Sequence, residues 1–254
     1  MSQPVTVTHE GQVTVIRINR PHVRNAVDLA TARALREAWQ AFDGDDNARV
    51  GILTGGDEVF CAGADLKAAD ELLPHVQGTT GPLGFTRLSV SKPTIAAIAG
   101  YCVAGGLELA CWCDVRVADE SAVFGCFERR FGVPLVDGGT VRLPQIVGLG
   151  RALEMILTGR AVHVEEAYRW GLVNTLTPRG AHLAHALELA QTLASFPQAC
   201  LRNDRASAYG ALGLPLHDAL QQEADFGMAT VQSGETQAGA SAFRGGKGRK
   251  GARE

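Results

Sequence analysis

The sequence predicts an α/β fold with largely parallel strands, followed by a helical C-terminal region. Short apolar strand patterns alternate with helical patterns in the first half, whereas helical periodicity dominates from about residue 140. Neither a linker nor an internal repeat divides the chain of 254 residues. We therefore expect one α/β core over residues 1–195 and a helical region over residues 196–254 that ends in a basic, glycine-rich tail.

The chain begins with the pattern of a β-hairpin, followed by that of an amphipathic helix. Apolar residues alternate on either side of the turn at Glu10-Gly11. Ile16 and Ile18 add apolar groups on the opposite face, so the end of the second strand is expected to be buried on both sides. Asp28 can cap the helix that follows. The apolar face of this helix consists of Leu29, Ala32, Leu35, Trp39 and Phe42.

Short apolar runs farther along the chain predict buried strands at residues 50–54, 94–99, 115–117 and 122–124. Between Lys92 and Asp114 the only charged residue is Glu108, and an apolar run of this length can span a bilayer. However, a proline and several glycines interrupt the run, and a central carboxylate is costly in lipid. We interpret the run as a buried strand, a glycine turn and a buried helix that begins near Gly105.

The second half is mostly helical. A short strand is expected at residues 172–175, after a glycine. Helices are predicted at residues 149–157, 164–170, 181–193 and 216–228, and glycines follow the first two.

Composition and charge exclude several classes of function. A net charge of −3 argues against a large nucleic-acid surface, because binding to phosphates needs a basic patch. Residues 244–249 are a local exception, which we interpret as a solvated tail. The start of the chain lacks the regions of a signal peptide, and the six cysteines form no C-x-x-C pair. We expect a cytoplasmic protein with reduced, mostly buried thiols and no metal, since Cys111 and Cys113 lack companions at a ligand spacing.

Glu108 lies in a predicted helix that is otherwise apolar on every side, so this helix is expected in the interior. Burial of a lone carboxylate is unfavourable unless the group is paired or protonated. Burial also raises the pKa of a carboxyl toward the range useful for proton transfer. Two interpretations are open: a catalytic carboxyl, or a structural glutamate bonded to a buried arginine or to backbone amides.

Two glycine-containing segments can expose backbone amides. Gly105-Gly106 occupies the first turn of this helix, where N–H groups have no helical partner and the helix dipole is positive. A strand is expected to end at Ala62-Gly63-Ala64. Two amides that converge on one oxygen form an oxyanion hole, and each donor contributes about 3 kcal/mol to lowering a barrier. The alternative is two tight turns that bind nothing.

Glu128 is the third candidate. Arg129 and Arg130 follow it directly, so a surface ion pair that contributes little energy is the alternative to a catalytic role. The stretch Gly100–Gly106 is not G-x-G-x-x-G, and no acidic residue follows a second strand at the distance that a dinucleotide site requires. The sequence contains no G-x-x-x-x-G-K-[ST] or G-x-S-x-G pattern. Dinucleotide-binding, P-loop and α/β-hydrolase motifs are therefore excluded.

In this order and at these separations, the segments resemble the crotonase, or enoyl-CoA hydratase/isomerase, superfamily. The resemblance covers roughly residues 5–200 and rests on Asn19–Ala26, Phe60–Lys67, Ala99–Asp114 and Phe124–Pro144. It implies a spiral of ββα units with a C-terminal helical trimerisation region. It also implies an acyl-CoA substrate, no separate cofactor, and a homotrimer or a dimer of trimers.

The resemblance further implies roles for residues at the matching positions. The backbone amides of Ala64 and Gly105 would form the oxyanion hole for the thioester oxygen. Glu108 would bind and activate water, while Glu128 would exchange the proton on the carbon next to the carbonyl. Lys67 would lie near the phosphates of coenzyme A. The expected coenzyme A-binding residues are Val23, Arg24, Ala26, Ala62, Asp65, Leu66 and Lys67.

Departures from the family pattern leave the acyl group open. Cys126-Phe127 stands where the typical hydratase has Gln-Pro before its second glutamate. Asp137 lies one position from the third acid of dienoyl-CoA isomerases. It is either an additional acid in the pocket or, as we favour, a loop carboxylate that bonds the amides of Gly138-Gly139. The segment Ala68–Gly84 is expected to border the acyl pocket, although it matches no pattern of the family.

Three functions follow from the sequence, in decreasing order of support. The first is hydration of a trans-2-enoyl-CoA, because both glutamates are retained. The second is another crotonase reaction, either double-bond isomerisation or thioester hydrolysis. The third is an acyl-CoA-binding or RNA-binding protein without catalysis, which the basic tail supports weakly.

Overall fold

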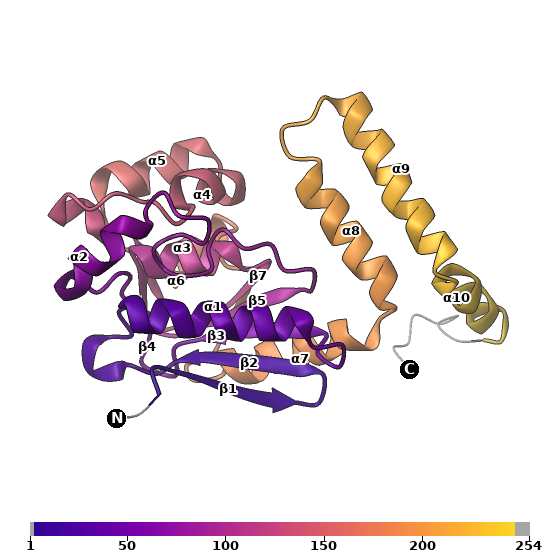
Figure 1. The fold of residues 1–254 in the computed structure, drawn as a ribbon, viewed down its shortest axis with the longest axis horizontal. Coiled ribbons are helices and arrows are strands. Elements are labelled where there is room, and N and C mark those ends of the chain that lie inside the picture. The colour runs from indigo at the N-terminus through magenta and orange to yellow at the C-terminus, as the bar shows by residue number, and fades with distance from the viewer. Residues whose placement is uncertain (1–2, 247–254) are drawn as a thin grey trace. The chain divides into compact units, whose positions relative to one another are not determined.

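The computed structural model describes residues 3–246. The chain forms two compact units, Met1–Ala194 and Ser195–Glu254. Every strand that the described residues form belongs to the first unit, and the second unit is helical (Figure 1).

A six-stranded sheet runs through the first unit in the order β1-β2-β3-β5-β7-β10 (Figure 1). Its strands are β1 (Val5–Glu10), β2 (Val13–Ile18), β3 (Val50–Thr54), β5 (Thr94–Ile98), β7 (Val115–Asp119) and β10 (Thr175–Thr177). The β1–β2 hairpin is antiparallel, and all other neighbours in this sheet are parallel. The predictions of an N-terminal hairpin and of a largely parallel sheet are confirmed.

A second sheet has four strands in the order β4-β6-β8-β9. Its strands are β4 (Val59–Cys61), β6 (Tyr101–Val103), β8 (Val123–Gly125) and β9 (Val162–His163). In each of three successive turns, the chain passes from the large sheet to the small one, as β3 to β4, β5 to β6 and β7 to β8. This repeated passage is the predicted spiral. Strand β6 was missed, because its three residues lie inside the stretch interpreted as a glycine turn.

Two helices join the sheets into one core. Helix α1 (Leu29–Gly44) begins at Asp28, whose carboxylate accepts from the backbone N–H of Thr31 at 2.8 Å, as the sequence predicts. Its predicted apolar face is buried except at the half-buried Leu29. Helix α3 (Gly105–Trp112) is buried along all eight residues, so the prediction of an interior helix is confirmed.

The remaining elements of the first unit cover the sheets and border the site. Residues 172 and 173 are buried but belong to no strand, so the strand predicted at residues 172–175 begins later, at Thr175, and this boundary was wrong. The helices and short 3₁₀ turns are η1 (Pro21–Val23), η2 (Leu66–Ala68), α2 (Ala69–Leu72), η3 (Leu73–His75), η4 (Phe127–Phe131), α4 (Gly139–Val147), α5 (Leu149–Thr158), α6 (Val164–Arg169) and α7 (His182–Ser195).

Helix α7 covers one face of the large sheet. Ala186, Ala190 and Ala194 follow each other at the spacing of one helix face and pack on apolar side chains of the parallel strands. Small side chains at these positions let the helix lie close to the sheet. The sheet residues of this second core are Val13, Val15, Val50, Ile52, Ile95, Ala97 and Val117.

The second unit consists of α8 (Gln198–Gly210), α9 (Leu216–Gln232) and α10 (Glu235–Arg244). Of these helices only α9 was predicted, with its first residue correct and its end placed at residue 228. Helix α8 buries a single residue, Ser207, and therefore has no apolar stripe for a sequence pattern to reveal. Instead, the carboxylate of Glu235 accepts from the first free amides of α8, at Ala199 and Cys200. The basic tail extends to residue 249 and so lies partly outside the described residues.

Five of the six cysteines are buried and Cys200 is half-buried, and all six are free thiols. The expectation of mostly buried thiols is confirmed. Within residues 3–246, no helix is long and apolar enough to cross a membrane. The run from Lys92 to Asp114 forms β5, β6 and α3 instead.

Candidate active site

A cavity of about 520 Å³ lies in the first unit and gathers most of the residues singled out from the sequence. Arg24 does not line it; the backbone carbonyl of this residue accepts from the N–H of Ala62 at 3.1 Å. The eleven predicted residues that do line the cavity are Val23, Ala26, Ala62, Ala64, Asp65, Leu66, Lys67, Gly105, Glu108, Glu128 and Asp137.

The backbone amides of Ala64 and Gly105 lie side by side at one wall. A Cβ atom placed on Gly105 would lie 3.5 Å from the nitrogen of Ala64, and one placed on Gly63 would lie 2.7 Å from the nitrogen of Gly105. Within residues 3–246, neither amide nitrogen donates a hydrogen bond. The backbone of Ala104 has a positive φ of 52°, a strained conformation that sets the start of α3 against the Gly63 turn.

The two glycines at the start of α3 have different reasons to be glycine. A Cβ atom on Gly106 would lie 2.1 Å from the carbonyl oxygen of Cys61, so this glycine allows the helix to pack on β4. A Cβ atom on Gly105 would enter the cavity wall between Leu83 and the amide of Ala64. Gly105 therefore keeps the space in front of the two amides open.

Glu108 extends from α3 into this cavity and is 3% exposed. Its Oε1 accepts from the backbone N–H of Asp137 at 2.9 Å and from that of Gly139 at 2.8 Å. Burial raises the pKa of Glu108 to about 8; the two amide bonds oppose this rise, and the nearby carboxyls of Asp137 and Glu128 add to it. Glu108 thus has the backbone-amide partners expected of a structural glutamate. It also lines the cavity, as expected of a catalytic carboxyl.

Glu128 lies in the first turn of η4 and is 7% exposed. Neither of its carboxylate oxygens has a hydrogen-bond partner among the described residues, and burial raises its pKa. The surface ion pair considered from the sequence is wrong. Arg129 Nε donates instead to the carbonyl of Ile156 at 3.1 Å, and Arg130 Nη2 donates to that of Gly159 at 2.9 Å.

Asp137 is a buried loop carboxylate, but its partners differ from those that we expected. The amide of Gly139 donates to Glu108, and no bond joins the Asp137 carboxylate to Gly138-Gly139. Its Oδ1 accepts instead from the backbone N–H of Leu83 at 3.2 Å and from Thr86 Oγ1. Burial raises the pKa of Asp137 against the lowering effect of these bonds.

The segment from Ala68 to Gly84 borders the cavity, as predicted. The cavity residues that it supplies are Ala69, Leu72, Leu73, Val76, Pro82 and Leu83. Residues after the second glutamate supply a facing set, which is Phe131, Gly132, Val133, Pro134 and Val136. Because nearly all of these side chains are apolar, the cavity can accommodate an apolar acyl chain. This role was predicted only from the position of the segment between the two family motifs.

Arg20 is a residue that the sequence analysis missed. Its Nη2 lies 2.9 Å from a carboxylate oxygen of Asp28, and its Nη1 lies 3.2 Å from one of Asp65. The other oxygen of Asp65 caps η2 by accepting from the N–H of Lys67 at 3.1 Å. Arg20 therefore fixes the start of α1 to the turn that follows the Ala64 amide. An arginine in the segment Asn19–Ala26, together with acidic residues at positions 28 and 65, is the signal that could have revealed it.

Known proteins share this combination of sequence and fold. Residues 8–248 match the family model described as enoyl-CoA hydratase/isomerase. The chain belongs to this family.

Similar proteins include two that are named as hydratases of coenzyme A thioesters. The chain is 35% identical over 248 residues to enoyl-CoA hydratase EchA19 of Mycobacterium tuberculosis, covering 93% of this chain and 92% of the relative. It is 39% identical over 187 residues to mevalonyl-coenzyme A hydratase sidH of Aspergillus fumigatus, covering 71% and 68%. The crystal structure of enoyl-CoA hydratase EchA1 from Mycobacterium marinum superposes with a TM-score of 0.91 at 35% identity, covering 96% of each chain.

Proposed function

We propose that this family member is an enoyl-CoA hydratase, which adds water across the double bond of a trans-2-enoyl-CoA. One observation carries the proposal. Two buried carboxyls, Glu108 and Glu128, line the same cavity as two adjacent backbone amides that have no acceptor among the described residues. Names of relatives, which include an enoyl-CoA hydratase and a mevalonyl-CoA hydratase, support the same class of reaction.

In the proposed reaction, the N–H groups of Ala64 and Gly105 donate to the thioester oxygen. Water attacks the β-carbon, so negative charge moves onto this oxygen as an enolate forms. Donors that already point at the site stabilise that charge without reorganisation, which lowers the barrier by about 3 kcal/mol per donor.

The two glutamates divide the proton transfers between them. Glu108 has one oxygen fixed by two amides, which leaves its other oxygen to bind the water. In the reacting form of the pair, Glu108 is ionised and takes a proton from this water, while Glu128 holds the one proton of the pair. Glu128 supplies a proton to the α-carbon as the enolate collapses. The hydroxyl thus joins the β-carbon, one proton joins the α-carbon, and the pair of carboxyls still holds one proton at the end. These transfers need no separate cofactor.

Binding of the substrate is proposed to use the two ends of the cavity differently. Lys67 is exposed in η2 and is the cation that we assign to the phosphates of coenzyme A. The apolar walls at residues 69–83 and 131–136 are proposed to hold the acyl chain. Arg24 does not line the cavity, so any contact that it makes with coenzyme A is proposed to involve a part of coenzyme A that lies outside the cavity.

We also propose a homotrimer or a dimer of trimers that works in the cytoplasm. The support for assembly is that the helical unit exposes many large apolar side chains. They include Leu212, Leu214, Leu216, Leu220 and Met228. The molar mass of the purified protein, measured by light scattering, tests the proposal: a mass near three or six chains supports it, and a mass of one chain contradicts it.

The test of the function is loss of the enoyl absorbance when purified protein meets crotonyl-CoA, repeated with a longer trans-2-enoyl-CoA and with Glu128→Gln. We expect loss with the unaltered protein and none with the variant. Binding of coenzyme A without any loss of absorbance would contradict hydration. An isomerase or hydrolase would be favoured instead if Asp137→Asn abolished turnover while Glu108→Gln did not.

A further inference from the structure

We infer that Asp137 is a positioning residue, which holds Glu108 and the acyl wall at Leu83 in a fixed relation, and that it is not a third acid. The inference rests on the proposed hydration for its kinetic consequences and on contacts of the described residues for its geometry.

Asp137 makes contacts in two directions. Its backbone N–H donates to Glu108 Oε1 at 2.9 Å, so the main chain of this residue orients the glutamate. Its side chain accepts from the N–H of Leu83 at 3.2 Å and from the hydroxyl of Thr86. One residue therefore connects the carboxyl on α3 with the loop that forms part of the acyl wall.

The loop on the other side is shaped around this carboxylate. A Cβ atom on Gly81 would lie 2.3 Å from Thr86 Oγ1 and 2.6 Å from Asp137 Oδ1, and the positive φ of 78° at Gly81 turns the chain toward them. Leu83, inside the same loop, approaches the amide pair, because its Cδ1 would lie 2.6 Å from a Cβ atom on Gly105. Movement of the loop would therefore reach both the acyl wall and the oxyanion hole.

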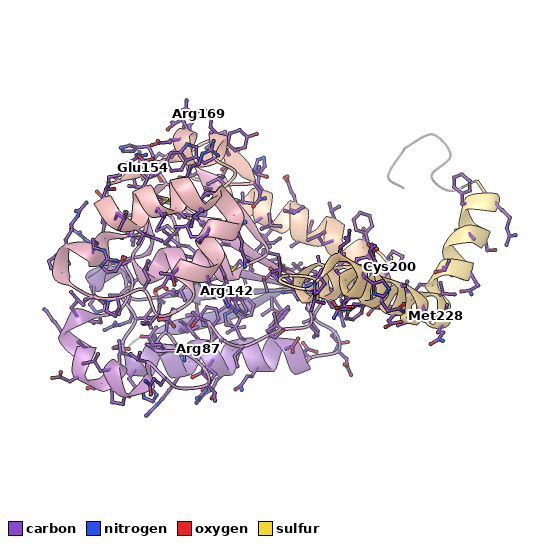
Figure 2. The ribbon with its side chains drawn as sticks, turned by 90° about the horizontal axis from the view of Figure 1, so that it is seen from above. Arg87, Arg142, Glu154, Arg169, Cys200 and Met228 are labelled. Atoms are coloured by element: carbon purple, nitrogen blue, oxygen red, sulfur yellow. The ribbon has the colours of Figure 1, made fainter. Side chains whose placement is uncertain are left out.

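Two arginines make parallel connections between the same segments. Arg142 donates to the carbonyl of Asp137 at 3.0 Å and to that of Thr86 at 2.6 Å. Arg87 donates to the carbonyl of Val136 at 3.0 Å. Figure 2 marks Arg87 and Arg142 in the first unit. These contacts with main-chain carbonyls fix the two segments to each other, and three members of the network, Leu83, Val136 and Asp137, also line the cavity.

Substitutions of Asp137 can distinguish a positioning role from acid catalysis. Both donors to the Asp137 side chain meet one oxygen, Oδ1. The carbonyl oxygen of an asparagine can accept the same two hydrogen bonds, whereas an asparagine cannot transfer a proton as a carboxyl does. An alanine removes both the bonds and the charge. The three side chains therefore report on two different roles.

The charge of Asp137 has a second consequence. Its carboxyl contributes to the raised pKa of Glu108, as does that of Glu128, while Arg87 and Arg142 lower the pKa of Asp137 itself. Loss of the charge in Asp137→Asn removes a repulsion that favours protonated Glu108. The alkaline limb of the hydration profile, where the carboxyl pair loses its last proton, is therefore expected to move to lower pH.

The experiment compares Asp137→Asn and Asp137→Ala in the full chain. We expect kcat for crotonyl-CoA to stay within about fivefold in the asparagine variant and to fall about fiftyfold or more in the alanine variant. The alkaline limb moves to lower pH in both variants. Thr86→Val removes one of the two donors and is expected to lie between them.

Asp43 offers a matched control. Its Oδ1 accepts from the N–H and the hydroxyl of Ser91, both at 2.8 Å. This carboxylate, on α1, thus meets the same two kinds of donor as Asp137, and neither Asp43 nor Ser91 lines the cavity. Asp43→Ala and Asp43→Asn are expected to change kcat less than twofold. A large loss in Asp43→Ala would show that any broken loop contact lowers activity, and the inference would then fail.

Crystal structures of the two Asp137 variants decide the inference without reference to turnover. We expect Glu108 Oε1 to stay within hydrogen-bond distance of the Gly139 nitrogen in Asp137→Asn and to move away in Asp137→Ala. Inactive Asp137→Asn with an unmoved Glu108 would make Asp137 a third acid, and an unmoved Glu108 with full activity in Asp137→Ala would exclude positioning. If the unaltered protein does not hydrate enoyl-CoA, the proposed function fails, and these structures still test the geometry.

Discussion

The two walls of the cavity carry the same residue type in opposite states of hydrogen bonding. Glu108, on α3, has one oxygen held by two backbone amides, whereas both oxygens of Glu128, on η4, have no partner among residues 3–246. Both side chains are more than nine-tenths buried, so burial does not distinguish them. The fold therefore holds one carboxyl by an oxygen and leaves both oxygens of the other without a partner among the described residues.

This difference fits a division of labour. A carboxyl that must hold a water molecule at a fixed position needs a fixed oxygen, and Glu108 has one. A carboxyl that exchanges a proton with carbon needs an oxygen without competing hydrogen bonds, as Glu128 has. Because two such groups share one cavity, the protons belong to the pair, and its pH dependence follows from both residues together.

The largest expected effect comes from neutralising either carboxyl. Glu108→Gln and Glu128→Gln should each lower kcat for crotonyl-CoA by about 10³-fold, the range of general acid–base catalysis. Because the two groups act in one reaction, kcat of the double variant should be only slightly lower than that of the less active single variant. Glu120→Gln, at an exposed glutamate, is the control. Losses that multiply in the double variant would mean that the carboxyls act independently.

Blocking the amide pair should have the next largest effect. Gly105→Ala places a methyl group 3.5 Å from the nitrogen of Ala64 and against Leu83, so the thioester oxygen can no longer approach both amides. We expect kcat to fall about 10²-fold, as on loss of one oxyanion donor. Gly150→Ala is the matched control, because a Cβ atom there meets nothing within 4 Å. Equal activity of the two variants would contradict the oxyanion hole.

A smaller effect is expected on stability, and its sign follows from the raised pKa of Glu108. The pKa rises from 4.5 to about 8 on folding, so the folded state binds more protons between these values. The stabilising contribution is complete below the lower value and is lost as pH rises through about 8. The protein should therefore lose about 4 kcal/mol of unfolding free energy between pH 5 and pH 8.5 relative to Glu108→Gln. Denaturant melts at the two pH values measure it, and parallel curves would contradict it.

The smallest effect sharpens the comparison between the walls. A Cβ atom on Gly139 would lie 3.0 Å from both Cγ and Oε1 of Glu108, while the cavity position of Glu128 is untouched. Gly139→Ala should therefore displace Glu108, and a misplaced catalytic group reacts more slowly. We expect the rate of hydration to fall about tenfold, which corresponds to a barrier higher by about 1.4 kcal/mol. Exchange of the α-proton of butyryl-CoA should not change. Equal losses in both reactions would show that the walls are not independent.

Parts of this site could be predicted from the sequence because their cause is local. An apolar helix with one glutamate predicts a buried carboxyl, and glycines in its first turn predict exposed amides; both features occur in α3. The hairpin and the strands that end at glycines follow from patterns of a few residues. These local features correctly gave the alternation of elements in the first unit.

The hydrogen bonds that distinguish the two glutamates could not be predicted in the same way. The amides that hold Glu108 come from residues 137 and 139, about thirty positions away, and the partners of Asp137 come from residues 83 and 86. A local sequence pattern does not predict which of several nearby donors will form a hydrogen bond with a buried oxygen. Helix α8 was missed for a related reason, because a distant carboxylate, that of Glu235, stabilises its first turn.

The division of labour is tested most directly by α-proton exchange of butyryl-CoA in deuterated water, followed by mass spectrometry. This saturated thioester needs the amide pair and Glu128 but no water attack. We predict that Glu108→Gln retains most of the exchange while losing hydration of crotonyl-CoA, and that Glu128→Gln loses both. Exchange that survives in Glu128→Gln and disappears in Glu108→Gln would contradict the account.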